Sequence, residues 1–174
     1  MRGDEQHWPD GEPLEPVGAV APDVLRTVAG AFPTGVAAIT VVHDNRPYGF
    51  AANAFSSLSL EPPLVLVCAA RTSRTRPVLV AAGAFTINFL AADQEDVCRS
   101  LARKDDDKFA DITWEPGPLG HPRIAGAVGY LDCTLHSLLP GGDHVIFTGF
   151  VSAAESNDAA PLIFHRGKFA SPVA

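Results

Sequence analysis

The sequence predicts one mainly β domain with a few short helices, arranged as an antiparallel barrel with helical insertions. Roughly six or seven short segments have strand character, and they do not alternate regularly with helices as in a doubly wound fold. No G-x-G-x-x-G pattern follows the first strand, which argues against a Rossmann-type nucleotide fold. The 174 residues, 47% of them hydrophobic, are enough for one substantial core.

The chain is expected to begin with a flexible extension over residues 1–21, followed by the folded domain over residues 22–174. The extension is rich in glycine, proline and acidic residues and has no hydrophobic period. A short helix is then predicted to begin at Pro22, because apolar residues recur at helical spacing. Asp23 is its expected N-cap and Pro33 its stop.

The next segments predict a hairpin and a buried strand. Val36–His43 is β-branched and ends at turn-forming residues 44–47, so residues 48–55 are expected to return as its hairpin partner. The continuous apolar run Leu64–Ala70 predicts a strand buried on both faces. A short helix is expected over Pro77–Ala82, with Gly83 closing it.

The second half of the chain predicts further strands around one more helix. That helix is expected over Asp93–Ala102, with Asp93 as its N-cap. The expected strands are Phe85–Leu90, Ala127–Leu138, His144–Ala153 and Leu162–Phe164, the last followed by a turn at Arg166-Gly167.

Charge and cysteine usage exclude several classes of function. A formal net charge of −7 argues against nucleic acid as a partner, since phosphate binding needs a basic face. The three cysteines form no C-x-x-C pair and the histidines show no metal-ligand spacing, so no metal site is expected. No apolar stretch approaches the ~20 residues of a membrane span. Reduced thiols and the lack of a signal-like start predict a cytoplasmic protein.

Three stretches carry candidate chemistry. Residues 49–64 (GFAANAFSSLSLEPPL) combine small and hydroxyl side chains that would suit a flat ring with a polar edge, or form an ordinary strand with exposed serines. Residues 71–76 (RTSRTR) lie between a strand and a helix, as a phosphate cradle or a solvated basic turn. Residues 141–144 (GGDH) form either a hairpin turn with a surface histidine or a tight turn that aims His144 into a cleft.

These stretches, in this order, resemble the flavin reductase-like family over about Val24 to Phe169. The matching segments are LRTVAGAFPTGVAAITV (25–41), GFAANAFSSLSLEPPLVLV (49–67), the S-x-T turn at 73–75, FTINFL (85–90), DKFA (107–110), GGDHVIFTGFV (141–151) and PLIFHRGKF (161–169). One such motif would be weak, but seven in the family's order are specific.

The resemblance implies an FMN-binding split β-barrel, usually a homodimer. Such an enzyme reduces FMN or FAD by hydride transfer from NADH or NADPH and supplies the reduced flavin to a partner monooxygenase. The flavin is itself the redox centre, so the protein's task is to bind and orient. Two alternatives remain open. They are a flavin-binding or sensor protein without catalysis and an oxidase of the pyridoxamine-phosphate type on the same barrel.

The resemblance also carries roles onto individual residues. His144 matches the family histidine beside the nicotinamide and is the candidate catalytic residue, in a positioning role. The candidate cofactor-binding residues are Thr34, Gly35, Val36, Asn53, Ala54, Phe55, Ser56, Ser59, Leu60, Ser73, Thr75, Lys108, Arg166, Gly167, Lys168 and Phe169. Many relatives carry Thr-Ala-Ser-Ser where this chain has Ala51-Ala52-Asn53-Ala54, so two hydroxyls are absent from the expected flavin site.

Overall fold

The structure, a computed structural model, describes residues 18–104 and 107–170. In this part of the chain the helices are α1 (Pro22–Ala29), α2 (Thr75–Ala82) and α3 (Glu95–Ala102). The strands are β1 (Thr34–Gly35), β2 (Ala37–His43), β3 (Arg46–Ala52), β4 (Phe55–Leu60), β5 (Pro63–Ala70), β6 (Ala84–Phe89), β7 (Trp114–Pro116), β8 (Pro122–Ile124), β9 (Gly129–Gly141), β10 (His144–Ser156), β11 (Ile163–His165) and β12 (Lys168–Ala170). The expected mainly β class with short helices is confirmed.

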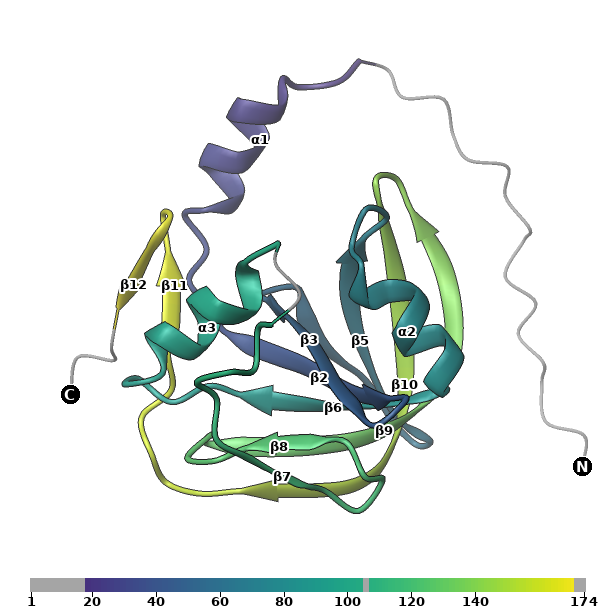
Figure 1. Cartoon of the computed structure of the whole chain (residues 1–174). Coiled ribbons are helices and arrows are strands. Elements are labelled where there is room, and N and C mark those ends of the chain that lie inside the picture. The colour runs from purple at the N-terminus through teal and green to yellow at the C-terminus, as the bar shows by residue number, and fades with distance from the viewer. Residues whose placement is uncertain (1–17, 105–106, 171–174) are drawn as a thin grey trace, which may run out of the picture.

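Seven strands form one antiparallel sheet in the order β3-β2-β6-β9-β10-β5-β4. The sheet does not close, because β3 and β4 are its two edges. These edge strands are nevertheless consecutive in the chain and are joined through Asn53 and Ala54, so the sheet must curl to bring its edges near each other. Figure 1 shows α3 and α2 on either side of β3 and β5. The result is an open barrel. We define its split as the gap between β3 and β5, because residues of these two strands, and none of β4, line the larger pocket described below.

Tight turns set the register of the hairpins. Asp44 and Asn45 have φ angles of 49° and 57° between β2 and β3, a left-handed conformation that Asp and Asn tolerate. Gly142, with φ 68°, connects β9 to β10, and Arg166 and Gly167 connect β11 to β12. The turns expected at these three places are therefore confirmed.

The core has two clusters, one on each face of the sheet. Alternate residues of β2 contribute to both, because successive side chains of a strand point to opposite faces. Ile39 packs in the cluster with Phe85 and Phe147, and α2 adds Leu79 to this cluster. Ala38 belongs to the cluster on the other face, where α3 contributes Leu101. Both helices that border the split are thus anchored in the core.

Several expected helix boundaries are wrong. The N-cap of α1 is Ala21 and that of α3 is Gln94; neither makes a side-chain capping bond, so Asp23 and Asp93 are not the caps. Helix α1 ends at Ala29, before Pro33, with Gly30 at its C-cap. Helix α2 begins two residues before Pro77, because proline is tolerated in a first turn, where its missing N–H has no partner to lose.

Two expected strands also differ. The segment 48–55 is not one hairpin partner, because the chain leaves the β2 edge at Asn53 and joins the far edge of the sheet as β4. Strand β5 alternates between buried and half-buried residues, so it is buried on one face rather than both. Its second face borders the split and the pocket described below.

Helix α1 stands away from the barrel in Figure 1, and none of its residues is buried. Most of the expected extension, residues 1–17, lies outside the described residues, and residues 18–21 are exposed and belong to no helix or strand. The described helices have eight residues each, too few to traverse a bilayer.

Candidate functional site

A pocket of about 720 Å³ fills the split between β3 and β5. Nine consecutive residues, from Arg46 to Ala54, form one wall along β3. The other walls come from the end of β5, the start of α2, the end of α3, the loop after α3 and the start of β10. Their lining residues are Cys68, Ala69, Ala70, Thr72, Ser73, Arg74, Thr75, Leu101, Ala102, Arg103, Lys104, Lys108, Phe109 and His144. A volume of this size lies in the upper part of the range of roughly 300–1,000 Å³ for small-molecule sites.

Gly49 holds the middle of this pocket together. Its carbonyl oxygen accepts hydrogen bonds from Thr75 Oγ1 at 3.1 Å and from Lys108 Nζ at 3.2 Å. Lys108 Nζ also donates to the carbonyl of Leu101 at 2.8 Å. A β-carbon on Gly49 would lie 3.1 Å from Leu101 Cδ2 and from Phe109 Cζ, so only glycine lets these side chains approach so closely. Helix α2, helix α3 and β3 are therefore tied together at one residue.

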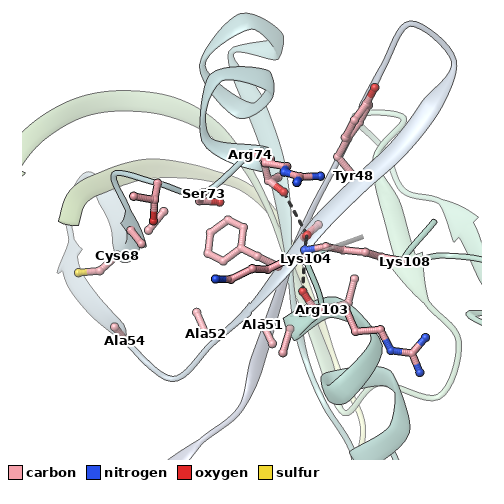
Figure 2. Close-up of a pocket in the computed structure, with 18 of the residues that line it drawn as sticks. Tyr48, Ala51, Ala52, Ala54, Cys68, Ser73, Arg74, Arg103, Lys104 and Lys108 are labelled. Atoms are coloured by element: carbon pink, nitrogen blue, oxygen red, sulfur yellow. Dashed lines mark hydrogen bonds between the residues drawn. The ribbon is translucent and has the colours of Figure 1, made fainter. Parts of the chain in front are cut away.

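One end of the pocket is lined by small side chains. Ala51, Ala52 and Ala54 face it from the β3 side, and Ala69 and Ala70 from β5. Figure 2 shows Ala51, Ala52, Ala54 and Cys68 along this end, with Tyr48 at the opposite end. Methyl groups leave the backbone accessible, so this end suits a broad, flat ring. Asn53 and Ala54, predicted from the sequence, lie here.

The rest of the pocket is basic. Arg46, Arg74, Arg103, Lys104 and Lys108 line it, five of the 13 lysines and arginines in a chain of net charge −7. Concentrating cations in a cleft raises the local concentration of anionic ligands.

The expected phosphate cradle at residues 71–76 is present in part. Thr72, Ser73, Arg74 and Thr75 line the pocket, whereas Arg71 turns away and donates from Nε to the carbonyl of Gly142. The single hydroxyl hydrogen of Thr75 is already donated to Gly49, so this side chain fixes α2 against β3. Ser73 is half-buried in the pocket wall. Of Ser73 and Thr75, the Ser73 hydroxyl is therefore the better placed to donate a hydrogen bond to a ligand.

His144 stands at the first position of β10, opposite Ala70 of β5, and lines the large pocket. Its side chain is 46% exposed, and Nδ1 lies 2.7 Å from Asp143 Oδ1. The hydrogen bond to His144 lowers the pKa of the Asp143 carboxyl, which therefore stays ionised as an acceptor. With Nδ1 held by the carboxylate, the ring is oriented and Nε2 is left for a ligand.

A smaller pocket of about 260 Å³ adjoins the first, and Asn53 lines both. The candidate residues Thr34, Gly35, Val36 and Phe55 line this second pocket. The structure thus brings ten of the predicted residues to two neighbouring pockets: Thr34, Gly35, Val36, Asn53, Ala54, Phe55, Ser73, Thr75, Lys108 and His144.

The remaining candidates lie outside both pockets of the single chain. Ser56 and Ser59 are on the edge strand β4, as is Leu60, which is 92% exposed. Arg166, Gly167, Lys168 and Phe169 form the β11–β12 turn and strand, where the Phe169 ring lies 5.5 Å from that of Phe164.

Sequence reasoning missed several residues of the large pocket, among them four with polar side chains. Arg46 and Tyr48 were part of an expected turn and strand, and Arg103 and Lys104 part of a charged loop, of which residues 105–106 lie outside the described part. Nothing in the local sequence joins these two segments. Their neighbourhood follows from the packing of α3 on β3, where Leu101 approaches Gly49.

The thiol in the lining of the large pocket belongs to Cys68. Burial raises the pKa of the Cys68 thiol, which disfavours the reactive thiolate. No group of three or more histidine, cysteine or acidic side chains that could hold a metal is found among the described residues.

Comparisons with known proteins place this chain in one family. The model of the flavin reductase like domain matches residues 29–172. The chain is 44% identical over 152 residues to the flavin-dependent monooxygenase reductase subunit HsaB of Rhodococcus jostii, covering 87% of this chain and 78% of that protein. It also superposes on the NADH:FAD oxidoreductase SgcE6 of Streptomyces globisporus, solved with NAD and FAD fragments, with a TM-score of 0.82 and 40% identity, over 88% of this chain and 95% of the other. Nitrilotriacetate monooxygenase component B of Mycobacterium thermoresistibile gives a TM-score of 0.84 at 40% identity, over 87% and 86% of the two chains. The chain belongs to the flavin reductase-like family.

Proposed function

We propose that the large pocket binds flavin, as FMN or FAD, and that His144 orients NADH or NADPH against it. As a member of this family the protein is an enzyme, an NAD(P)H-dependent flavin reductase. Its reduced flavin is supplied to a partner monooxygenase, in keeping with the relatives that are reductase subunits of such systems. The observation that carries the site assignment is that one pocket along β3 has an alanine-lined end and is lined by basic side chains over the rest of its length.

The residues present fit a flavin. The alanine-lined end matches a flat tricyclic ring, and Asn53 adds an amide that can both donate and accept at the ring's polar edge. Ser73 and Lys108 lie further along the pocket, where a ribityl phosphate would need donors. The bound flavin supplies the redox chemistry, so the chain's own residues bind, orient and exclude water.

His144 is placed to position the nicotinamide. The second pocket, with Thr34, Gly35 and Val36, adjoins the alanine-lined end through Asn53. His144 borders the large pocket from β10, with its ring held by Asp143. Holding two reactants in one orientation supplies several kcal/mol of barrier reduction.

The test is NADH or NADPH oxidation, followed at the absorbance of the reduced nucleotide, with FMN, FAD or no flavin added. We expect turnover that depends on added flavin, and the assay also identifies the preferred flavin and nucleotide. Flavin binding without oxidation of either nucleotide would favour a flavin-binding protein without catalysis. No binding of either flavin would remove the pocket assignment itself.

We propose that the protein works as a homodimer. Helix α1 buries no residue, and an isolated helix of eight residues is marginal in water. It nevertheless exposes Val24, Leu25 and Val28, and Leu60 is exposed on the edge strand β4. Exposed apolar side chains of this kind are typical of a protein–protein interface. A second copy over these surfaces would also cover Ser56 and Ser59, which the single chain leaves outside its pockets.

Light scattering coupled to gel filtration is expected to give a mass twice that of the chain. Replacing both Leu25 and Val28 by aspartate should yield a monomer, because charge would enter the apolar face of α1. Arg26→Ala, on the opposite face of the same helix, should remain a dimer. A monomer for the unmodified protein would contradict the proposal. The cytoplasmic location expected from the sequence remains a prediction.

A further inference from the structure

The large pocket is longer than a flavin mononucleotide requires. It follows β3 from Asn53 back to Arg46. At roughly 3.3 Å per residue, this stretch spans roughly 20 Å. The proposed phosphate donors, Ser73 and Lys108, lie near its middle, because Lys108 Nζ bonds to the carbonyl of Gly49 and Thr75, two residues after Ser73, bonds to the same carbonyl. Beyond Gly49 the pocket continues past Tyr48 and Pro47 to Arg46, roughly 10 Å further.

The far end carries an aromatic ring and a cation. Tyr48 is half-buried, and the Arg46 guanidinium carbon lies 5.9 Å from the centroid of its ring. Arg46 is exposed and makes no ion pair within the described residues. Aromatic rings provide stacking faces for nucleobases, and an arginine guanidinium beside such a ring adds a cation–π contact to a stacked base. Figure 2 shows Tyr48 at the opposite end of the pocket from Ala54 and Cys68.

We propose that this far end binds the adenylyl half of FAD, with Tyr48 stacking on the adenine and the Arg46 guanidinium adding a cation–π contact to the same base. The inference rests on the proposed function, since it takes the flavin ring to lie at the alanine-lined end. It makes Arg46 and Tyr48 the residues that discriminate FAD from FMN. FMN ends at its single phosphate and cannot reach them.

The nicotinamide nucleotide is the other phosphorylated ligand that could occupy a basic surface. His144 and the smaller pocket, which would receive its nicotinamide, adjoin the alanine-lined end. Arg46 and Tyr48 lie at the opposite end, beyond the proposed flavin phosphate. The adenylyl half of FAD is continuous with the flavin and runs along β3 toward them, so the geometry favours it.

The test is the dissociation constant of FAD and of FMN, measured separately by quenching of flavin fluorescence without any nucleotide. The unmodified protein should bind FAD at least about tenfold more tightly than FMN. Tyr48→Leu should weaken FAD binding by about five- to a hundredfold, the range for loss of one stacked base. Its effect on FMN binding should stay below about twofold, and the FMN value reports whether the pocket is still folded.

Matched variants separate the causes. Tyr48→Phe keeps the ring and should retain FAD affinity. Arg46→Ala should weaken FAD selectively, whereas Arg26→Ala removes the same charge from α1, away from both pockets. Equal loss of FAD and FMN affinity in Tyr48→Leu, or an unmodified protein that prefers FMN, would overturn the inference. Because binding is measured without turnover, failure of the proposed reductase activity would show separately, as absent NAD(P)H oxidation.

Discussion

Replacing Arg123 by methionine is expected to lower the free energy of unfolding by about 3–5 kcal/mol. The reason is Asp132, a carboxylate on β9 with no exposed side-chain surface. It accepts hydrogen bonds from Thr86 Oγ1 at 2.7 Å and from Arg123 Nη2 at 2.6 Å and Nε at 3.2 Å. Methionine fills a similar volume but leaves the buried charge without its partner, and that desolvation penalty is the cost.

Thermal and denaturant unfolding measure this effect. For a chain of this length each kcal/mol shifts the melting temperature by about 2–4 °C, so a fall of roughly 6–20 °C is expected. Arg99→Met is the matched control, because Arg99 pairs with Glu95 on the exposed face of α3, where ion pairs contribute at most about 1 kcal/mol. Adding Asp132→Asn to Arg123→Met should restore part of the loss. Equal effects of Arg123→Met and Arg99→Met would show that the buried pair is not needed.

Several strands and turns of this fold were predictable because their signals are local. Alternating and β-branched runs gave β2 and β10, and the residue types at 44–45, 141–143 and 166–167 fit the left-handed turns found there. The break at Asn53 was not predictable, because nothing in GFAANAFSS marks where the chain leaves edge strand β3 and begins the opposite edge strand, β4. The passage of the chain from β3 to β4 depends on how the whole sheet curls.

The site was predictable where each residue belongs to a recognisable stretch. Asn53, Ser73 and His144 come from three such stretches, and the structure brings all three to one pocket. Arg46 and Tyr48 lacked any signal, because a turn followed by a strand is ordinary in sequence. Their importance follows from β3 being the edge strand along which the pocket runs, a fact of tertiary structure.

His144→Ala is expected to raise KM for the nicotinamide nucleotide and to slow hydride transfer by about 10- to 100-fold, the cost of losing alignment by about an ångström. Stopped-flow mixing of flavin-loaded protein with NADH, or with NADPH if that is the preferred nucleotide, separates the effect on nucleotide binding from the effect on hydride transfer. The dependence of the observed rate on nucleotide concentration gives both the affinity and the limiting rate. Flavin affinity should change little. His136→Ala removes an exposed histidine that lines neither pocket, and serves as the control.

The neighbouring carboxylate distinguishes positioning from proton transfer by His144. Asp143→Asn keeps the size of the side chain but weakens its hold on Nδ1, so nucleotide affinity should fall by a smaller factor than in His144→Ala. If His144 only orients the nucleotide, the limiting rate of hydride transfer in the unmodified protein stays constant across the titration range of a histidine. A limiting rate that follows a single ionisation near neutral pH, and loses that dependence in His144→Ala, would instead assign the proton to this ring. Unchanged KM and hydride-transfer rate in His144→Ala would refute both roles, because a histidine that touches the nucleotide cannot be removed without moving one of them.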